Sequence, residues 1–187
     1  MKMISQLGDK ALLGGAVYFA HHWLGKTEGF AVMTAFSVSV SFLGMLKLLF
    51  AEGRPFFLDT RVHPASCKDL EYGFPSGHAT TSTATYFTLL FCLIRKVPLL
   101  RDNITLQMLA MIALFSVVNV VCFSRLFLGV HSLDQLFVGF VIGAVICIWL
   151  CQTHNSSLNL TRSVILRDWG SATRIFTTAP YVVFTLA

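Results

Sequence analysis

The chain has 187 residues, of which 55% are hydrophobic and only 12% are charged, and its mean hydropathy is +0.71. This balance lies well outside that of soluble domains, and the length indicates one domain over residues 1–187. The formal net charge of +5 comes from 14 scattered basic residues, which argues against nucleic-acid binding, because a nucleic-acid-binding protein concentrates its basic side chains on one face.

Apolar runs predict several transmembrane helices. Each run is near the length that a helix needs to cross the hydrocarbon core, and a helix satisfies its own backbone hydrogen bonds there. The clearest runs are residues 30–50, 76–94, 105–123 and 136–151. We therefore expect an all-α, multi-pass transmembrane bundle embedded in a lipid bilayer.

Two further apolar runs raise the expected number of crossings from four to as many as six. Residues 11–24 form a short run that contains His21 and His22, and this run could be a signal-like segment, a re-entrant piece or a clipped span. We favour an imperfect first crossing. Residues 175–187 are also apolar and stop with the chain, as in a truncated helix.

The cysteines do not form a metal-binding or disulfide pattern. Only Cys67 lies in a polar loop, and no CxxC spacing is present. We predict that the other four are small packed apolar side chains, namely Cys92, Cys122, Cys147 and Cys151.

Counting crossings places the polar loops 51–75 and 124–133 on one face of the membrane. The opposite face carries more Lys and Arg residues, so the positive-inside rule makes it cytoplasmic. The polar loops would then face the lumen or the exterior, in the endoplasmic reticulum or plasma membrane. Glycosylation sequons beginning at Asn103, Asn155 and Asn159 fall on the predicted cytoplasmic face and argue for the reverse orientation.

Two cationic residues stand at the end of the 30–50 run. Placing the charged side chain of Lys47 at membrane depth costs free energy, so Lys47 is a functional candidate. Arg54 follows after two helical turns, so in a continuous helix both side chains would share a face, although Pro55 disfavours helix at Arg54. The alternative is that both side chains extend to the membrane surface.

The next candidate is the sequence Pro-Ser-Gly-His, directly before the second long run. Ser76 is a suitable N-cap, Gly77 lets the backbone approach a ligand closely, and the amide groups of a helix N-terminus favour an anion. His78 would face that anion and could donate a proton to a leaving oxygen. The alternative is a capped helix with a histidine at the membrane surface.

A third cluster follows the 105–123 run. Ser124 and Arg125 precede His131, and Asp134 stands three residues later. On a helix this spacing puts Asp134 and His131 on one face, where the carboxylate could hold one ring nitrogen and leave the other free to attack. The alternative is a set of interfacial caps.

Together these residues suit phosphate. The permanent charges of Lys47, Arg54 and Arg125 can balance those of a phosphate monoester and its transition state, so no metal ion or other cofactor is expected. The nearby acids do not have the spacing of a divalent-cation site; they are Glu52, Asp59, Asp69 and Glu71.

These three elements resemble the signature of the type-2 phosphatidic acid phosphatase family, K-x6-R-P, P-S-G-H and S-R-x5-H-x3-D. Residues 47–55 and 75–78 match the first two, residues 124–131 match the third up to its carboxylate, and the likeness covers about residues 30–151. The resemblance implies a metal-independent phosphatase and assigns its site as follows. Lys47, Arg54 and Arg125 bind phosphate, Ser76 and Gly77 line it, His78 protonates the leaving group, and His131 forms a phosphohistidine that water hydrolyses.

The chain departs from this signature at the carboxylate. Gln135 stands four residues after His131, where the family has an acid, and Asp134 is one position early. Either the loop shifts so that Asp134 orients His131, or Gln135 orients it by a neutral hydrogen bond, as in sugar-phosphate phosphatase relatives. The family core commonly has six helices, so four clear spans leave open a shortened form or a fragment.

Residues 70–76 are most similar to sphingoid-base-phosphate phosphatases, and a site in the membrane suits a lipid tail. We therefore predict a lipid phosphate monoester, such as a sphingolipid, as the substrate. One alternative is a polyprenyl-diphosphate phosphatase. Another is a hexose-phosphate phosphatase, in which a glutamine stands at the position of Gln135. A third is a vanadium-dependent haloperoxidase, although those relatives are soluble. A non-catalytic lipid-binding relative is a further alternative, against which the intact His78 and His131 argue. The oligomeric state is not indicated.

Overall fold

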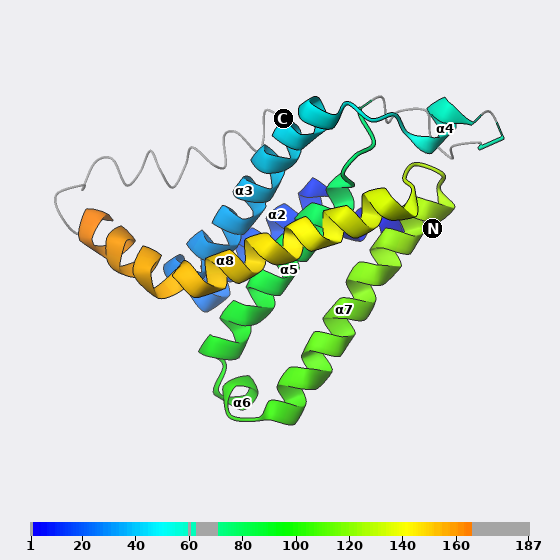
Figure 1. Cartoon of the computed structure of the whole chain (residues 1–187). Coiled ribbons are helices and arrows are strands. Elements are labelled where there is room, and N and C mark those ends of the chain that lie inside the picture. The colour runs from blue at the N-terminus through cyan, green and yellow to red at the C-terminus, as the bar shows by residue number, and fades with distance from the viewer. Residues whose placement is uncertain (1, 60, 63–70, 166–187) are drawn as a thin grey trace. The chain divides into compact units, whose positions relative to one another are not determined.

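The computed structural model describes residues 2–59, 61–62 and 71–165, and the side chains within these ranges up to residue 153, except that of Lys2. The chain divides into two compact units, Met1–Cys151 and Gln152–Ala187, and the fold and site belong to the first. The elements of the described residues, all of them helical (Figure 1), are α1 Lys2–Ser5, η1 Gln6–Gly8, α2 Lys10–Phe19, η2 Ala20–Leu24, α3 Lys26–Phe50, α4 Pro55–Leu58, α5 Gly77–Lys96, α6 Pro98–Arg101, α7 Ile104–Phe127 and α8 Leu133–Ile165.

Three of the predicted spans are long and apolar enough to cross a membrane. They correspond to α3 with the short α4, to α7, and to the first part of α8, namely Lys26–Leu58, Ile104–Phe127 and Leu133–Thr153. Helix α7 exposes apolar side chains such as Met108, Ile112 and Phe123, as expected for a surface that faces lipid. The prediction of a helical, multi-pass membrane protein is therefore confirmed.

The fourth predicted span, residues 76–94, forms helix α5 but is less apolar than the other three. Its buried side chains are largely hydroxyls, and several donate to carbonyls of their own helix, as Thr80 Oγ1 does to Ser76 O over 2.9 Å. Helix α5 packs against α2, α3 and α7. It is polar because it is surrounded by protein, not because it lies outside the bundle.

Helix α8 approaches α5 closely through two glycines. A Cβ atom on Gly143 would lie 2.6 Å from the backbone oxygen of Thr80, and one on Gly139 would lie 2.8 Å from that of Ser76. Only hydrogen fits at such distances, so these glycines set the separation of the two helices.

The run predicted as an imperfect first crossing forms α2 and the π-helical turn η2. Their ten and five residues rise only about 20 Å, which is short for a bilayer core, and this run is not among the candidate spans. Leu24 and Ala20 instead pack with Val32 of α3 and Cys92 of α5 in a small apolar core. The other partial run, residues 175–187, lies outside the described residues.

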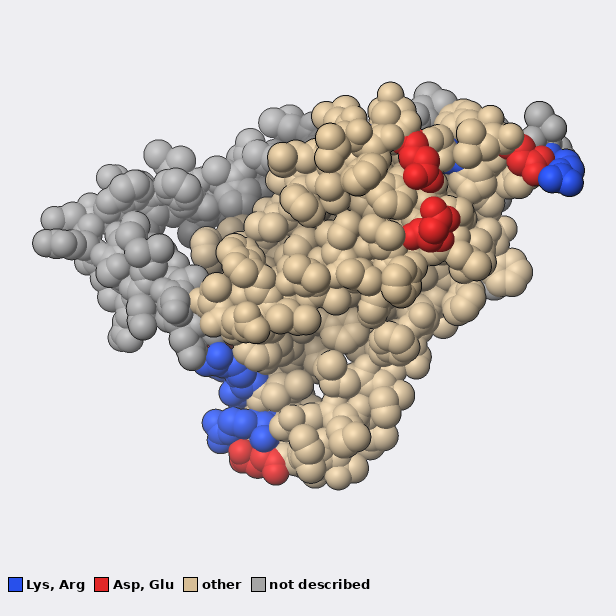
Figure 2. All heavy atoms as spheres, in the orientation of Figure 1, with Lys and Arg blue, Asp and Glu red and all other residues tan. Residues whose placement is uncertain are grey.

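Charged side chains lie at two edges of the face drawn in Figure 2. One group lies towards α4 and the other at the α6 turn, with uncharged side chains between them. Helices α5 and α7 run in opposite directions between these edges and are joined by α6 (Figure 1). The bundle thus has two polar ends, and the predicted motifs lie at the end where α5 begins and α7 ends.

Candidate active site

Backbone hydrogen bonds bring the three predicted motifs together. The Ser76 N–H donates to Gln135 O over 3.0 Å and joins the start of α5 to the first turn of α8. The Gly73 N–H donates to Glu52 O over 2.8 Å and joins the loop before α5 to the connection after α3. Segments far apart in the sequence therefore form one site.

Arg54 is a buried guanidinium that connects two of these loops. The residue is only 3% exposed, and its side chain donates from Nε to Glu71 O over 2.8 Å and from Nη1 to Val130 O over 3.2 Å. Such bonds offset the cost of burying a charge. Val130 is the neighbour of His131, so Arg54 holds its charge beside the predicted nucleophile.

Lys47 and Arg54 do not lie on one continuous helix, in agreement with the expectation that Pro55 disfavours helix at Arg54. Helix α3 ends at Phe50, because Ala51 adopts the left-handed conformation with φ 45° and donates back to Lys47 O over 3.0 Å. Arg54 reaches the site from an extended backbone that precedes α4. The end of the helix, rather than its continuation, positions the two cations.

Lys47 forms an ion pair with Glu71 over 2.6 Å between Nζ and Oε2. The lysine side chain is 13% exposed and the glutamate side chain 73%. The hydrogen bond from Lys47, then its charge, and then the charges of Lys10 and Arg54 lower the pKa of Glu71. Sequence reasoning gave Glu71 no role of this kind, and no local pattern relates it to a residue 24 positions earlier.

Two other predicted residues contact the N-terminal segment, which sequence reasoning did not connect with the site. His78 Nε2 lies 3.0 Å from Asp9 Oδ1. Arg125, which is 7% exposed, donates from Nη1 to the hydroxyl of Ser5 over 2.9 Å. Residues 5–9 therefore pack on the site, and a Cβ on Gly8 would lie only 2.9 Å from the His78 ring.

Ser76 occupies the N-cap position of α5, as predicted, but its hydroxyl does not cap the helix. The residue is fully buried, and its Oγ has no hydrogen-bond partner among the described residues. A buried hydroxyl without a partner costs about 1–3 kcal/mol. Together with the amide groups of the first turn, which includes Gly77, this hydroxyl suits an anion bound at the start of α5.

His131 lies just before α8 and is 3% exposed. Its Nδ1 atom is 3.1 Å from Gln135 Oε1. Burial and the charge of Arg54, followed by those of Arg125 and His78, lower the pKa of His131 to about 3 against the opposing effect of the Gln135 hydrogen bond. These positive charges disfavour a protonated imidazole, so His131 is neutral at physiological pH.

The structure brings Gln135, and not Asp134, to His131. The expected i to i+3 contact is wrong because α8 begins only at Leu133, so His131 stands outside the helix, and Asp134 is exposed. Gln135 instead reaches back across the first turn, where its Oε1 also lies 3.4 Å from the Ser132 amide nitrogen. The spacing Ser132 to Gln135 is that of a capping box, a signal that could have favoured Gln135 from the sequence.

The Gln135 amide is held from its other end by Glu52 and Gly53. Its Nε2 donates to Glu52 Oε1 over 2.8 Å and to Gly53 O over 3.3 Å. A continuous series of hydrogen bonds therefore runs from a carboxylate through an amide to the imidazole of His131.

No cluster of three or more His, Cys, Asp or Glu side chains within the described residues could hold a metal ion. Shared contacts connect several hydrogen-bond donors and cations: Lys47 and Arg54 both bond to Glu71, and Ser76 bonds to Gln135, which holds His131. Such a set is complementary to an oxyanion.

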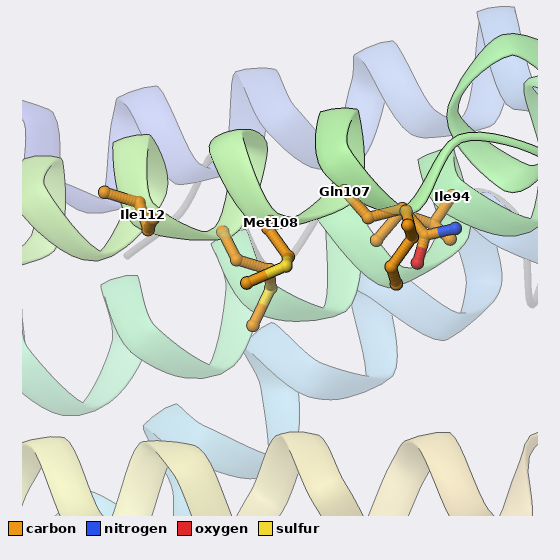
Figure 3. A pocket seen from close by; sticks show the side chains of 6 residues that line it. Ile94, Gln107, Met108 and Ile112 are labelled. Carbon is orange, nitrogen blue, oxygen red and sulfur yellow. The ribbon is translucent and has the colours of Figure 1, made fainter.

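An apolar hollow of about 420 Å³ lies elsewhere, at the α6 end of α5 and α7. Figure 3 shows side chains that line it, among them Ile94 of α5 and Gln107, Met108 and Ile112 of α7. It contains none of the predicted site residues.

The fold is that of a helical membrane protein, and its candidate site contains histidine and cationic side chains. The PAP2 superfamily model matches residues 28–158, and the chain belongs to this superfamily. The structure is similar to the crystal structure of the first transmembrane PAP2 type phosphatidylglycerolphosphate phosphatase from Bacillus subtilis, with a TM-score of 0.74 and 21% identity over 83% of this chain and 75% of that chain. At this identity the likeness establishes the fold. No curated protein sequence matches the chain significantly.

Proposed function

We propose that the chain is a membrane phosphatase that hydrolyses a lipid phosphate monoester through a phosphohistidine on His131. The observation that carries this proposal is the buried His131, held by Gln135, with the buried Arg54 bonded to the neighbouring Val130 and the start of α5 bonded to Gln135. The positive charges of Arg54, Arg125 and His78 also lower the pKa of His131. Membership of the PAP2 superfamily and the phosphatase activity named for the structural neighbour support it.

In the first half-reaction, His131 Nε2 attacks the phosphorus atom. A nitrogen–phosphorus bond forms while the ester oxygen leaves, and His78 gives that oxygen a proton. Arg54, Arg125 and the start of α5 stabilise the charge on the equatorial oxygens. In the second half-reaction, water loses a proton to His78 and attacks the phosphohistidine, which releases inorganic phosphate and restores His131.

The lowered pKa of His131 fits a nucleophile. An imidazole that stays unprotonated at neutral and mildly acidic pH retains its lone pair for attack. When the substrate binds, Lys47 changes its ion-pair partner: a phosphate oxygen takes the place of the exposed Glu71 carboxylate. The substrate dianion then supplies the negative charge that Glu71 provides in its absence.

A lipid substrate is favoured because the site lies at one end of apolar helices that can cross a membrane. Within the lipids, a sphingoid-base phosphate is the narrower proposal, and it rests on the likeness of residues 70–76. A second candidate is a hexose phosphate, which the neutral Gln135 beside His131 favours.

The site is proposed to face the lumen or the exterior, because Arg95, Lys96 and Arg101 lie at the opposite end, beside α6. Labelling the variants Arg101→Cys and Glu71→Cys with an impermeant thiol reagent in sealed vesicles tests this orientation. Labelling of Arg101→Cys from the lumenal or exterior side, or of Glu71→Cys from the cytoplasmic side, would contradict it.

The enzymatic proposal is tested by phosphate release in detergent, with a chelator present and a panel of sphingoid-base, glycerolipid, polyprenyl and hexose phosphates. We expect release from lipid phosphates and a loss of roughly 10³-fold or more in His131→Ala, because the nucleophile is removed. His22→Ala is the matched control, since His22 is exposed on η2 and stacks on Tyr18. Strong dependence on added metal, or equal activity of His131→Ala, would reject the mechanism.

A rapid quench with 32P-labelled substrate separates covalent catalysis from direct attack by water. The wild-type chain should retain acid-labile, base-stable 32P, and His131→Ala should retain none. Turnover without any trapped label in the wild type would favour water as the nucleophile.

A further inference from the structure

We infer that Glu52 is a positioning residue that fixes the tautomer of His131 through the Gln135 amide. This inference rests on the proposed function and extends it to Glu52, which occupies one of the unspecified positions of the first motif. Glu52 is 83 positions from Gln135, to which it is hydrogen-bonded, and it acts on the imidazole through that residue.

The argument begins with the direction of the amide. A glutamine side chain has one donor end and one acceptor end. A backbone carbonyl and an ionised carboxylate can each accept hydrogen bonds but not donate them. Glu52 and Gly53 O therefore require the donor end of the Gln135 amide. The Oε1 end must then face His131 Nδ1 and the Ser132 amide, and both of these must donate to it.

The consequence falls on the imidazole. If Nδ1 carries the proton that it donates to Gln135, then the neutral ring leaves Nε2 unprotonated. Nε2 is therefore the nitrogen with a lone pair for phosphorus. With the amide reversed, Nδ1 would accept and Nε2 would carry the proton, and the ring could not attack.

Packing around the Gln135 side chain fixes the plane of its amide but does not decide which end of the amide faces His131. Gln135 is 1% exposed, and a Cβ on Gly73 would lie 2.9 Å from its Nε2 and 3.0 Å from its Oε1. The Gly73 N–H also donates to Glu52 O over 2.8 Å, which keeps this loop against the amide. Packing therefore restricts rotation out of the plane, whereas a reversal within it changes the shape little.

Glu52 is the group that decides between the two directions. Gly53 O accepts over 3.3 Å, a long bond, while the Glu52 carboxylate accepts over 2.8 Å with a full charge. Without Glu52, only two long hydrogen bonds favour this direction, one to Gly53 O over 3.3 Å and one from the Ser132 N–H over 3.4 Å. Where the family signature has an acid, this chain has the neutral Gln135, and Glu52 supplies the carboxylate one hydrogen bond farther from the ring.

The test compares Glu52→Met, which removes the acceptor at similar size, with Glu52→Gln, which keeps an oxygen acceptor but not the charge. We expect Glu52→Met to lower kcat about 10- to 100-fold, the range for residues that orient a catalytic ligand, with KM within about twofold. Glu52→Gln should lie between it and the wild type. Glu28→Gln is the matched control, because Glu28 pairs with Lys96 at the other end of the bundle.

Two further readouts separate positioning from a merely structural effect. In protein labelled with 15N-histidine, the His131 signals should shift from the Nδ1–H tautomer towards the Nε2–H tautomer in Glu52→Met. The double variant Glu52→Gln with Gln135→Glu should regain activity over Glu52→Met, because the new amide can donate to the new carboxylate, which again accepts from Nδ1. In the double variant, the carboxylate beside His131 should also raise the pKa of the imidazole, which moves the acid limb of the pH profile of kcat/KM towards neutral pH.

An active wild type whose Glu52→Met variant keeps both its kcat and its His131 tautomer would overturn this inference alone. If the variant melts at a much lower temperature, the tautomer and pH profile of Glu52→Gln and the double variant decide the question. A wild-type chain that releases no phosphate would instead reject the proposed function.

Discussion

The two ends of the helix pair α5 and α7 are built differently. At the end that holds His131, charged and polar side chains are buried and hydrogen-bonded: Arg54 donates to Val130 O, and Gln135 bonds to His131. At the α6 end the ion pairs are exposed, such as Arg101 with Asp102, and an apolar hollow lies between the helices.

This difference indicates that buried, hydrogen-bonded polar side chains are concentrated at the His131 end. Exposed ion pairs contribute little to stability, so the α6 end can vary at small cost. Buried charges are tolerated only with well-placed partners, so each residue at the His131 end constrains several others. We therefore expect matched substitutions at the two ends to have very different consequences.

The largest contrast is expected between two arginines. Arg125→Lys should reduce kcat/KM by about 10²- to 10³-fold, because a lysine cannot reproduce the buried guanidinium that lies near His131 and donates to Ser5. Arg101→Lys, at the α6 turn, should stay within about twofold of the wild type. Steady-state kinetics on both variants measure this contrast, and equal losses would remove the proposed distinction between the ends.

A second contrast concerns two glycines. Gly143→Ala should destabilise the protein by about 1–3 kcal/mol, because the new methyl group would meet the Thr80 carbonyl and force α8 from α5. Gly44→Ala has open space around its Cβ and should be neutral or stabilising by up to about 1 kcal/mol. Thermal melting in detergent compares them, and a stable, active Gly143→Ala would show that α8 can shift freely.

The third contrast is in the pH dependence of stability. The pKa of His131 is about 3 in the folded protein and about 6.5 in an unfolded chain, so between these values the unfolded chain binds more protons. Stability should therefore be unaffected by this group above about pH 7 and should fall as the pH decreases below 6.5, by at most about 1.4 kcal/mol per unit.

Melting temperatures at about pH 7.5 and about pH 5.5, on either side of the ordinary histidine pKa, test this dependence. His131→Asn should remove part of the decrease, while substitution of the exposed His22, in His22→Asn, should leave it unchanged. The pKa of Glu71 is also lowered, and its contribution should be lost only at more acidic pH, near and below its ordinary value. An unchanged decrease in His131→Asn would contradict the burial of a neutral imidazole.

The smallest effect is expected in the apolar hollow. Met108→Ala removes a half-exposed side chain from its lining, and we expect kcat/KM to change less than about twofold because no site residue contacts the hollow. Kinetics with a long-chain and a short-chain lipid phosphate measure it. A loss confined to the long-chain substrate would mean that the hollow takes part in substrate binding.

Much of the fold could be predicted from the sequence, because membrane spans depend on local properties. Long apolar runs predicted α3, α7 and α8, and Pro-Ser-Gly-His predicted the start of α5. Hydropathy alone did not reveal that α5 lies inside the bundle. Its buried Thr80, Thr83 and Thr85 make sense only beside neighbouring helices.

The candidate site was predicted only in part. Motif spacing selected Lys47, Arg54, His78, Arg125 and His131, whose chemistry is a property of each residue type. The partners of these residues were not predicted. Ser5 is 120 positions from Arg125, and Asp9 is 69 from His78, so no local periodicity connects them.

The sequence by itself therefore determined which residues are candidates for phosphate chemistry, and that they lie near the ends of apolar helices. Only the tertiary structure decided that Gln135 rather than Asp134 holds His131, and that Glu52 holds Gln135. The physical reason is that hydrogen-bond direction depends on groups brought together by folding, whereas hydrophobicity and helix capping are already present along the chain.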